Sequence, residues 1–445
     1  MQVQQLIGEM FPASNHQLHI GGVGVQKLAE QFGTPLFVYD ESVLRRKWEL
    51  LRSTFPPRFH IYYSVKANPN PNLLAVFLAQ GAGLEIASAG ELHLAQEAGC
   101  PRSRILFAGP GKTPAEIEIA LQARIGEIHA ESLTELERIA TIAGRLNQTA
   151  PVALRVNPNG DAQGGAMRMG GKATPFGIDE ETLDGALDYA LSCSSIELRG
   201  IHLFAGTQLL DCEILMSQYR KGLQIARRVA ERIGRPLHSV DFGGGLGVPY
   251  FPNDQPLDMV LLKACLSEFV QQIDADPHFT GTRFVIEPGR FLAAEAGVYL
   301  ARVLDVKVSR GKIFAIVDGG MNHHLAASGN LGQTIKRNFP VAVATKLLQP
   351  EADTVDIVGP LCTPLDVLAR SLAVPPIEVG DLIAVFQSGA YARSASPLGF
   401  LSHPAPPEVL AADGEARLIR RRGEVADYLR DVEFACPAIA ANSQE

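Results

Sequence analysis

A lysine in the segment YYSVKAN is the first side chain along the chain with a clear chemical use. Lys66 follows an apolar run at residues 61–65 that has the composition of a β-strand. At the apolar end of a strand an amine is poorly solvated, so its pKa is expected to fall and its nucleophilicity to rise. Such an amine can form a Schiff base with a carbonyl group. A lone lysine is, however, more often an ordinary residue whose stem packs along a strand edge.

Two glycine-containing segments have the features of an anion site. Residues 241–247 read DFGGGLG, and a glycine run exposes backbone N–H groups and lets an anion approach closely. Residues 287–290 read EPGR, which places Gly289 and the cation Arg290 beside the carboxylate of Glu287. Each segment alone is weak evidence, because glycine runs also form plain turns.

Other apolar runs end in side chains that could surround a planar ring. The segment HLFAGTQ contains His202, the flat ring of Phe204 and the hydroxyl of Thr207. Two earlier runs end near Glu85 and in Arg155. Taken singly, an aromatic ring here is more often a core residue, and the charged groups are typical of helix starts and ion pairs.

Together these groups match the needs of one cofactor, pyridoxal 5′-phosphate (PLP). PLP requires a lysine for its aldehyde and a carboxylate that keeps its pyridine nitrogen protonated. Its phosphate requires N–H groups and a cation, and its ring a flat partner. The groups that meet these requirements are Lys66, Glu287, the 243–245 glycines with Arg290, and Phe204. The combination predicts a PLP enzyme in which Lys66 holds the cofactor as a Schiff base.

The elements that must position these residues alternate between short apolar runs and amphipathic segments. Eight runs with strand character begin near residues 61, 84, 105, 127, 152, 198, 239 and 283, with helical periodicity between them. Eight strands alternating with helices predict an α/β fold with a (β/α)8 barrel of the TIM type, whose sites lie at the carboxyl ends of the strands. An open doubly wound sheet is the alternative, but the GxGxxG that often follows its first strand is absent.

After residue 290 the pattern becomes β-rich with few helices, which predicts a mostly antiparallel β-domain. We expect four parts. Residues 1–40 contribute strands to the β-domain, residues 41–292 form the PLP-binding barrel, residues 293–436 form the C-terminal β-domain, and residues 437–445 form a tail.

Composition excludes several classes of protein. The 445 residues are 46% hydrophobic and 20% charged, as in soluble globular proteins, and the net charge of -8 disfavours nucleic acid as a partner. Neither a signal-peptide pattern nor a bilayer-spanning run is found, so we expect a cytoplasmic protein without a membrane partner.

The six cysteines are scattered, which favours reduced thiols. No metal site is expected, because the adjacent His323 and His324 lack a third ligand at helical spacing.

The sequence resembles the fold-type III PLP-dependent decarboxylases, the family of diaminopimelate, ornithine and arginine decarboxylases. The resemblance covers nearly the whole chain and rests on YYSVKAN, GGGLG, EPGR, GPLCTPLD at 359–366 and SGAY at 388–391. It implies an alanine racemase/ornithine decarboxylase-like pairing of barrel and β-domain. It also implies a homodimer with shared active sites.

The resemblance also implies a role for each matched residue. Lys66 would carry the internal aldimine, Glu287 would pair with the pyridine nitrogen, and Cys362 would reach in from the partner subunit to reprotonate Cα after CO2 leaves. Phe204 stands where the family stacks a histidine on the ring. The residues matched to the phosphate are Thr207, Gly243, Gly244, Gly245, Gly289, Arg290 and Tyr391. Those matched to positions near the ring and the lysine are Glu85, Glu91 and Arg155.

Departures from the family pattern bear on the substrate. Diaminopimelate and ornithine enzymes place an acid just after the cysteine, and here that position is Thr363. The Arg and Tyr that follow the DxGMN motif of diaminopimelate decarboxylases are replaced by Ala326 and Asn330. A site without partners for a charged distal group accepts diamino acids poorly. We expect Thr363, His323 and His324 to shape the substrate pocket instead.

These segments are closer to a divergent branch of the family. That branch includes the decarboxylase of butirosin biosynthesis, which acts on a glutamyl group tethered to an acyl-carrier protein, and decarboxylases encoded beside exosortase genes. The sequence therefore predicts a PLP-dependent carboxy-lyase that removes the α-carboxylate of an L-amino acid or of an aminoacyl group on a carrier protein. The basic run at 420–422 could meet an acidic carrier, although short charge runs are usually solvated surface.

Alternative functions remain open at this point. A decarboxylase of free diaminopimelate or another diamino acid shares every cofactor motif. An amino acid racemase would use opposed Tyr and Lys bases, and the cysteine context together with the full EPGR motif favours decarboxylation over it. A single-barrel PLP-binding protein would lack the ~150 residues that follow the barrel, and a cofactor-free barrel would be colourless.

Overall fold

The computed structural model describes residues 3–11, 13–14, 17–159, 167–168, 173–204, 206–333 and 335–433. The predicted tail at 437–445 and Cys436 lie outside these residues. The chain divides into two compact units. The first unit is Met1–Leu6, Asp40–Gly297 and Gln387–Ser394, and the second is Ile7–Tyr39, Val298–Phe386 and Ala395–Glu445. Helix α1 (Val3–Glu9) is divided between them.

The first unit contains a closed barrel of eight parallel strands. Their order is β9-β12-β14-β15-β5-β6-β7-β8, and β8 pairs again with β9, so the sheet has no free edge. The strands are β5 (Phe59–Ser64), β6 (Gly83–Ile86), β7 (Ile105–Phe107), β8 (Glu127–Ala130), β9 (Ala150–Asn157), β12 (Ile196–Leu203), β14 (Ser239–Asp241) and β15 (Arg283–Ile286). All eight fall on the runs that the sequence pattern predicted. The barrel fold is therefore confirmed.

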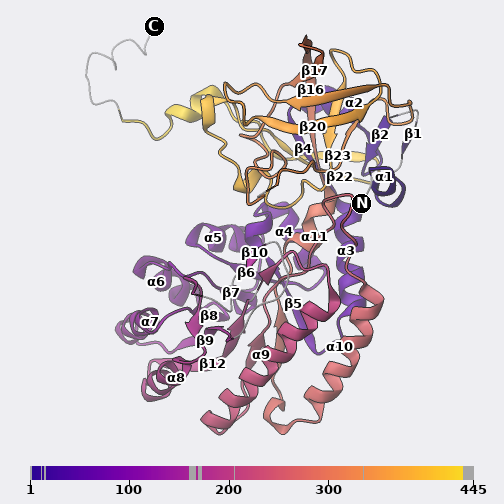
Figure 1. Cartoon of the computed structure of the whole chain (residues 1–445). Coiled ribbons are helices and arrows are strands. Elements are labelled where there is room, and N and C mark those ends of the chain that lie inside the picture. The colour runs from indigo at the N-terminus through magenta and orange to yellow at the C-terminus, as the bar shows by residue number, and fades with distance from the viewer. Residues whose placement is uncertain are drawn as a thin grey trace. The chain divides into compact units, whose positions relative to one another are not determined.

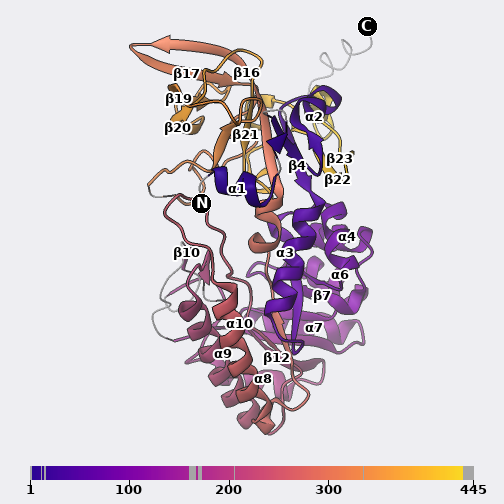
Figure 2. The ribbon, with the colours of Figure 1, turned by 90° about the vertical axis from the view of Figure 1, so that its right-hand side faces the viewer.

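Helices follow the strands and cover the barrel's outer face (Figure 1). They are α3 (Glu41–Thr54), which precedes β5, then α4 (Pro71–Ala79), α5 (Ala89–Glu97), α6 (Pro114–Ala123), α7 (Leu133–Arg145), α8 (Leu183–Ser192), α9 (Cys212–Ile233), α10 (Met259–Asp274) and α11 (Arg290–Ala293). Helices α9 and α10 lie side by side (Figure 2). Shorter elements of this unit are η1 (Val65–Ala67), η2 (Arg102–Arg104), β10 (Met167–Arg168), β11 (Ile178–Asp179), β13 (Gly206–Thr207), η3 (Pro277–Phe279) and η4 (Ala294–Ala296).

Local sequence explains where these helices begin. Helix α6 has proline at its first position and a capping box, in which the Thr113 side chain accepts from the Glu116 N–H and the Glu116 carboxylate accepts from the Thr113 N–H. The Ser88 hydroxyl accepts from the Glu91 N–H at the start of α5, and the Ser132 hydroxyl accepts from the Glu135 N–H at the start of α7. Each strand-to-helix turn is thereby fixed at the end of the barrel where the predicted site residues lie.

The second unit is built on a mostly antiparallel sheet. The strand order is β20-β19-β17-β16-β4-β22-β23, with β21 paired to β16 and β18 paired to β21. Only β17 and β19 are parallel among the pairs of this sheet with a described register. The bounds are β4 (Leu36–Asp40), β16 (Gly297–Ser309), β17 (Lys312–Val317), β18 (Val341–Val343), β19 (Asp353–Val358), β20 (Val367–Val374), β21 (Leu382–Val385), β22 (Glu408–Ala412) and β23 (Glu415–Arg420).

The N-terminal part of the second unit adds a small three-stranded sheet and one helix. Strand β4, from the segment predicted to join the β-domain, lies between β16 and β22 in the large sheet. The remaining elements are β1 (Ala13–Ser14), β2 (Gln17–Ile20), β3 (Val23–Gly24), α2 (Val25–Phe32), η5 (Arg393–Ala395), η6 (Phe400–Ser402) and η7 (Val425–Leu429). In the part of the chain that the structure describes, none of the helices has the length and apolar content needed to cross a bilayer.

Candidate active site

A cavity of about 210 Å³ opens at the carboxyl ends of the barrel strands. Eleven of the twelve residues predicted to bind the cofactor line it. They are Lys66, Glu85, Arg155, Phe204, Thr207, Gly244, Gly245, Glu287, Gly289, Arg290 and Tyr391. The twelfth, Gly243, is not among the lining residues. Its N–H donates to Asp241 Oδ1 at 2.8 Å, and its carbonyl accepts from the Glu287 N–H at 2.8 Å.

Lys66 faces the carboxylate of Glu85 inside this cavity. Its Nζ lies 2.9 Å from Oε1 and 2.8 Å from Oε2, and the Ser64 hydroxyl donates to Oε2 at 2.5 Å. The expected fall in the pKa of Lys66 is wrong. Desolvation does lower that pKa, but the charges of Glu85, Tyr391 and Glu287 raise it above the ordinary value. The amine is therefore held as an ammonium by its carboxylate partner.

A second carboxyl group of the same region has a strongly shifted pKa. Glu91, in the first turn of α5, accepts from the Ala87 N–H at 2.7 Å. Burial raises its pKa to about 7, and the charge of nearby Glu85 adds to the effect. Glu85 is therefore the member of this acidic pair that pairs directly with Lys66.

The cavity also has unpaired donors that fit a phosphate group. Arg290 donates through NH1 to the Tyr250 hydroxyl at 3.2 Å, and its guanidinium lies 4.6 Å from the centre of the Tyr391 ring. Its Nε is buried and has no hydrogen-bond partner in the described structure. The N–H groups of Gly244 and Gly245 likewise have none among the described residues. Two N–H groups and a cation at one end of a cavity match the requirements of an anion.

The glycines of this region are required by close backbone packing. A Cβ atom on Gly244 would lie 2.6 Å from the Glu287 carbonyl oxygen, and one on Gly289 would lie 2.9 Å from the Cβ of Ala67. Gly245 has a φ of +114°, which side chains disfavour. The loop after β14 therefore packs directly on the residue that follows β15.

A buried ionic network behind the cavity fixes Arg155, and the sequence analysis missed it. Arg155 NH1 lies 2.6 Å from Glu131 Oε1, which also accepts from the Gly109 N–H at 2.7 Å. Beside it, the Lys112 ammonium donates to Glu135 at 2.8 Å. The Arg155 guanidinium lies 6.0 Å from the centre of the Phe204 ring, so the acid network positions the cation next to the predicted ring platform.

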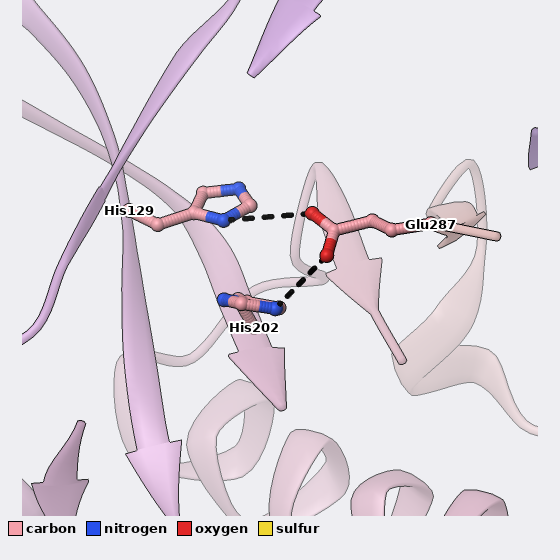
Figure 3. Close-up of side chains that lie close together, drawn as sticks. All are labelled: His129, His202 and Glu287. Atoms are coloured by element: carbon pink, nitrogen blue, oxygen red, sulfur yellow. Dashed lines mark ion pairs between the residues drawn. The ribbon is translucent and has the colours of Figure 1, made fainter. Parts of the chain in front are cut away.

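Glu287 also lies within a buried polar group that the sequence analysis did not identify. His202 Nε2 lies 3.4 Å from Glu287 Oε2, and His129 Nδ1 lies 4.0 Å from Glu287 Oε1, as Figure 3 shows. The residues of EIHAE at 127, 129 and 131 are all buried charged or polar side chains at alternate positions of β8 and just after it. That spacing of two was the available signal, because alternate residues of a strand share a face.

These three side chains also have the composition of a metal site. One ligand atom from each of His129, His202 and Glu287 lies within 4.8 Å of the others, and all three residues are buried. Two imidazoles and a carboxylate are ligands that divalent transition metals accept.

The predicted substrate and acid residues lie in the second unit. Cys362 is exposed, and none of Cys362, Thr363, His323 and His324 is among the cavity-lining residues. His323 and His324 are 2% and 0% exposed, and the Tyr299 hydroxyl lies 3.2 Å from His323 Nδ1. Their burial argues against direct contact with a substrate, so their predicted role has no support from this structure.

The basic run at 420–422 is engaged within the second unit. Arg420 pairs with Glu408, Arg421 lies 3.0 Å from Asp427, and Arg422 donates to backbone oxygens. Each of these arginines therefore has a hydrogen-bond or ion-pair partner within this unit.

Comparison with known proteins agrees with this site. Residues 41–294 match the family model described as "Pyridoxal-dependent decarboxylase, pyridoxal binding domain". The chain belongs to the pyridoxal-dependent decarboxylase family, and it is a PLP-dependent enzyme that decarboxylates an amino acid group. A buried acceptor without a partner at Glu287, a lysine in the cavity and free donors around Arg290 fit that cofactor.

Curated relatives and solved structures of this family match almost the whole chain. The L-glutamyl-[BtrI acyl-carrier protein] decarboxylase of Niallia circulans is 41% identical over 408 residues, which is 91% of this chain and 95% of the relative. The diaminopimelate decarboxylase of Aquifex aeolicus is 34% identical over 93% of this chain and 94% of its own. A diaminopimelate decarboxylase structure from M. jannaschii in complex with L-lysine has a TM-score of 0.88 at 28% identity, covering 98% of this chain and 99% of that one.

Proposed function

We propose that Lys66 is the residue that binds the cofactor covalently in this decarboxylase. The observation that carries the proposal is the position of its Nζ, 2.8 Å from Glu85 in the cavity, with Glu287 and Arg290 lining the same cavity. PLP, when bound, supplies an electron sink for the bond to the leaving carboxylate. Glu85 keeps the Lys66 amine oriented, while Glu287 would pair with the pyridine nitrogen and Arg290 with the glycine N–H groups would hold the phosphate.

Borohydride reduction of the yellow holoenzyme tests this assignment. We expect peptide mass spectrometry to find a stable pyridoxyl group on Lys66 and none on Lys112. The second lysine is an internal control, because it is also paired with a carboxylate but is buried and does not line the cavity. A holoenzyme that is reduced without modification of Lys66 contradicts the proposal.

For the substrate, we propose an aminoacyl group tethered to a carrier protein, as in the glutamyl-carrier decarboxylase that is 41% identical. The support comes from the second unit, where the acid, the Arg and the Tyr that the family uses for the distal end of the substrate are replaced by Thr363, Ala326 and Asn330. The Thr363 hydroxyl accepts from the Leu365 N–H at 3.3 Å, and the Asn330 amide donates to Ser328 Oγ at 2.6 Å. No charge is available at these positions to hold a free distal ammonium.

A substrate panel separates this substrate from its rival. Carbon dioxide release is measured with carrier-bound glutamate, free glutamate and free diaminopimelate, and we expect turnover only with the carrier-bound form. The rival, a diaminopimelate decarboxylase, is favoured by relatives at 34% identity that bear that name. Strong turnover of free diaminopimelate contradicts the tethered substrate but leaves the Lys66 assignment intact.

We further propose a homodimer in which Cys362 of one chain serves the cavity of the other. The exposed position of this thiol supports its delivery to another surface. Five cysteines in the described residues are unpaired, which supports a reducing compartment, and we propose the cytoplasm.

A further inference from the structure

Three buried side chains inside the barrel bring their ligand atoms close together (Figure 3). His129 lies in β8, His202 lies in β12, and Glu287 directly follows β15. One ligand atom from each lies within 4.8 Å of the others, and the residues are 0%, 2% and 5% exposed. His202 and Glu287 also line the cavity, so an ion can reach this group from there.

Most polar atoms of this group have no partner among the described residues. His129 Nδ1, both ring nitrogens of His202 and Glu287 Oε1 are buried atoms without a hydrogen bond there. Buried polar atoms in folded proteins are nearly always satisfied, and barrel interiors are usually filled by branched apolar side chains. Bound PLP offers Glu287 a single pyridine N–H, which is too few for four such atoms. The group therefore needs a further partner that accepts several lone pairs at once.

The spacing of these atoms matches the ligand shell of a transition-metal ion. His202 Nε2 lies 3.4 Å from Glu287 Oε2, and His129 Nδ1 lies 4.0 Å from Glu287 Oε1. Metal–ligand bonds of about 2.1 Å in a tetrahedral site place neighbouring ligand atoms about 3.4 Å apart. One pair already has this separation, and a small rotation of the His129 ring or of the Glu287 carboxylate closes the other. The centroids of the two imidazole rings are 4.4 Å apart, so both rings can reach one ion.

A carboxylate behind His129 fixes the orientation of that ring. His129 Nε2 lies 3.2 Å from Glu127 Oε1, and the Ser239 hydroxyl donates to Glu127 Oε2 at 2.6 Å. A histidine that binds a metal through one ring nitrogen almost always donates its other N–H to a carboxylate, a carbonyl or water, and this contact fixes the tautomer. With the Nε2–H donated to Glu127, Nδ1 is the unprotonated nitrogen, and Figure 3 shows that it faces Glu287.

We propose that His129, His202 and Glu287 form a binding site for one divalent transition-metal ion, such as Zn²⁺, in the chain without its cofactor. Three protein ligands leave a fourth coordination position for water from the cavity. The two imidazole nitrogens favour Zn²⁺ over Mg²⁺ and Ca²⁺, which prefer shells of oxygen atoms. Glu127 acts as a positioning residue, because it binds His129 and not the ion.

The metal ion and PLP exclude one another at this site. Glu287 is the residue proposed to pair with the pyridine nitrogen, and the same carboxylate is one of the three metal ligands. A dication beside a protonated ring nitrogen is also repelled, because charges in a buried site are poorly screened. This exclusion rests on the proposed function, whereas the metal site rests only on the three side chains and on Glu127. The apoenzyme is therefore the form that takes up the metal, and the metal opposes loading of the cofactor.

Zn²⁺ titration of the apoenzyme by calorimetry tests the site, with Mg²⁺ as the comparison ion. The chain carries Cys362→Ala throughout, because this exposed thiol can itself bind zinc. We expect one Zn²⁺ per chain and no binding of Mg²⁺. His202→Leu removes a ligand and abolishes the binding, and Glu127→Gln weakens it about 10–100-fold. The matched control is His324→Leu, which also removes a buried histidine and leaves the zinc affinity unchanged.

Two results overturn the metal site. One is an apoenzyme that does not bind one Zn²⁺ per chain, and the other is binding that both His202→Leu and Glu127→Gln leave unchanged. If these variants do not fold, the visible spectrum of Co²⁺ bound to the Cys362→Ala chain decides. A four-coordinate site absorbs strongly and supports the proposal, whereas the weak bands of a six-coordinate ion overturn it.

The borohydride-reduced holoenzyme tests the exclusion separately, because its cofactor cannot leave. We expect this form to bind no Zn²⁺ at the site, and one Zn²⁺ per chain overturns the exclusion while the metal site stands. A holoenzyme that is reduced without modification of Lys66 overturns the proposed function instead. Zinc binding by the apoenzyme does not depend on that result, so the two failures are distinguishable.

Discussion

The two units each contain a pair of buried histidines, and the surroundings of the pairs differ. In the barrel, His129 and His202 come from separate strands and lie among the carboxyl groups of Glu127 and Glu287. In the second unit, the adjacent His323 and His324 lie among aromatic rings. The His324 ring is 6.0 Å from Phe37, 5.8 Å from Tyr299 and 5.5 Å from Phe339 between centroids.

This difference shows that the spacing of two histidines in the sequence is a poor guide to their chemical environment in the fold. The neighbouring pair is conspicuous in the sequence but is packed as a core residue would be. The separated pair is inconspicuous, because 72 positions lie between its members, and only closure of the barrel brings them together. Burial lowers the pKa of both His202 and His324, so the two environments differ in the polar partners they offer rather than in the charge of the imidazole.

The largest expected effect tests whether the second unit contributes chemistry to the barrel at all. Lys66→Ala and Cys362→Ala should each lower activity at least about 100-fold, because each removes a reacting group. Co-expressed chains that pair at random should regain about a quarter of wild-type activity, since half of the dimers then hold one complete site. Carbon dioxide release measures this. Mixed dimers that stay inactive while both parents fold contradict the shared site.

The next effect tests the buried ionic character of the barrel. Glu131→Ala leaves Arg155 buried without its partner, and we expect the free energy of unfolding to fall by about 3–5 kcal/mol. The matched control is Glu118→Ala, which breaks the exposed pair with Arg145 and should cost under about 1 kcal/mol. Urea unfolding of both variants measures the difference, and equal losses would show that the Arg155 network is not buried.

The third expected effect is a dependence of stability on pH that comes from the buried His324. Burial lowers the pKa of His324 from 6.5 to about 3, so the folded state binds this proton more weakly than the unfolded state. Its contribution to stability is present above about pH 6.5 and is lost as the pH falls toward 3. We expect wild-type unfolding free energy to fall by roughly 3 kcal/mol over this window because of His324.

The variant His324→Leu should flatten that pH dependence without changing the affinity for PLP. Thermal melts between pH 7 and pH 4 measure it. A changed KM for the substrate would instead return His324 to the substrate pocket that the sequence predicted.

The smallest expected effect comes from Glu91 in the barrel, which lowers stability as the pH rises. The pKa of Glu91 is raised to about 7, so its stabilising contribution is present below about pH 4.5 and is lost as the pH rises through 7. Glu91→Gln should raise the unfolding free energy of the apoenzyme by about 1 kcal/mol at pH 8 and leave it unchanged at pH 4.5. Denaturant unfolding at the two pH values tests this, and an equal gain at both would exclude a titration effect.

The fold could be predicted from the sequence because its signals are local. Each barrel strand is an apolar run bounded by turn residues, and caps such as Ser88 and Thr113 mark the following helix. Eleven predicted cofactor residues meet at one cavity because parallel strands present their carboxyl ends together. The pKa of Lys66 could not be predicted in this way, because its direction depends on Glu85 from a neighbouring strand.

The buried polar side chains inside the barrel escaped prediction for a related reason. Alternation at Glu127, His129 and Glu131 was visible in the sequence, but a strand in a barrel is expected to be apolar on its inward face. Which partners stand across the barrel from β8, namely Ser239 for Glu127 and Glu287 for His129, follows only from the strand order.

The absent side chain at Gly244 has a consequence for how this enzyme can change over generations. Because a Cβ there would lie 2.6 Å from the Glu287 backbone oxygen, the loop proposed to hold the phosphate and the acid proposed to pair with the ring cannot move independently. A mutation that shifts the main chain of either segment is therefore expected to displace the other segment as well. In the second unit, by contrast, the Thr363 hydroxyl accepts from the Leu365 N–H of its own loop, so a change there carries no such coupling between the two barrel segments.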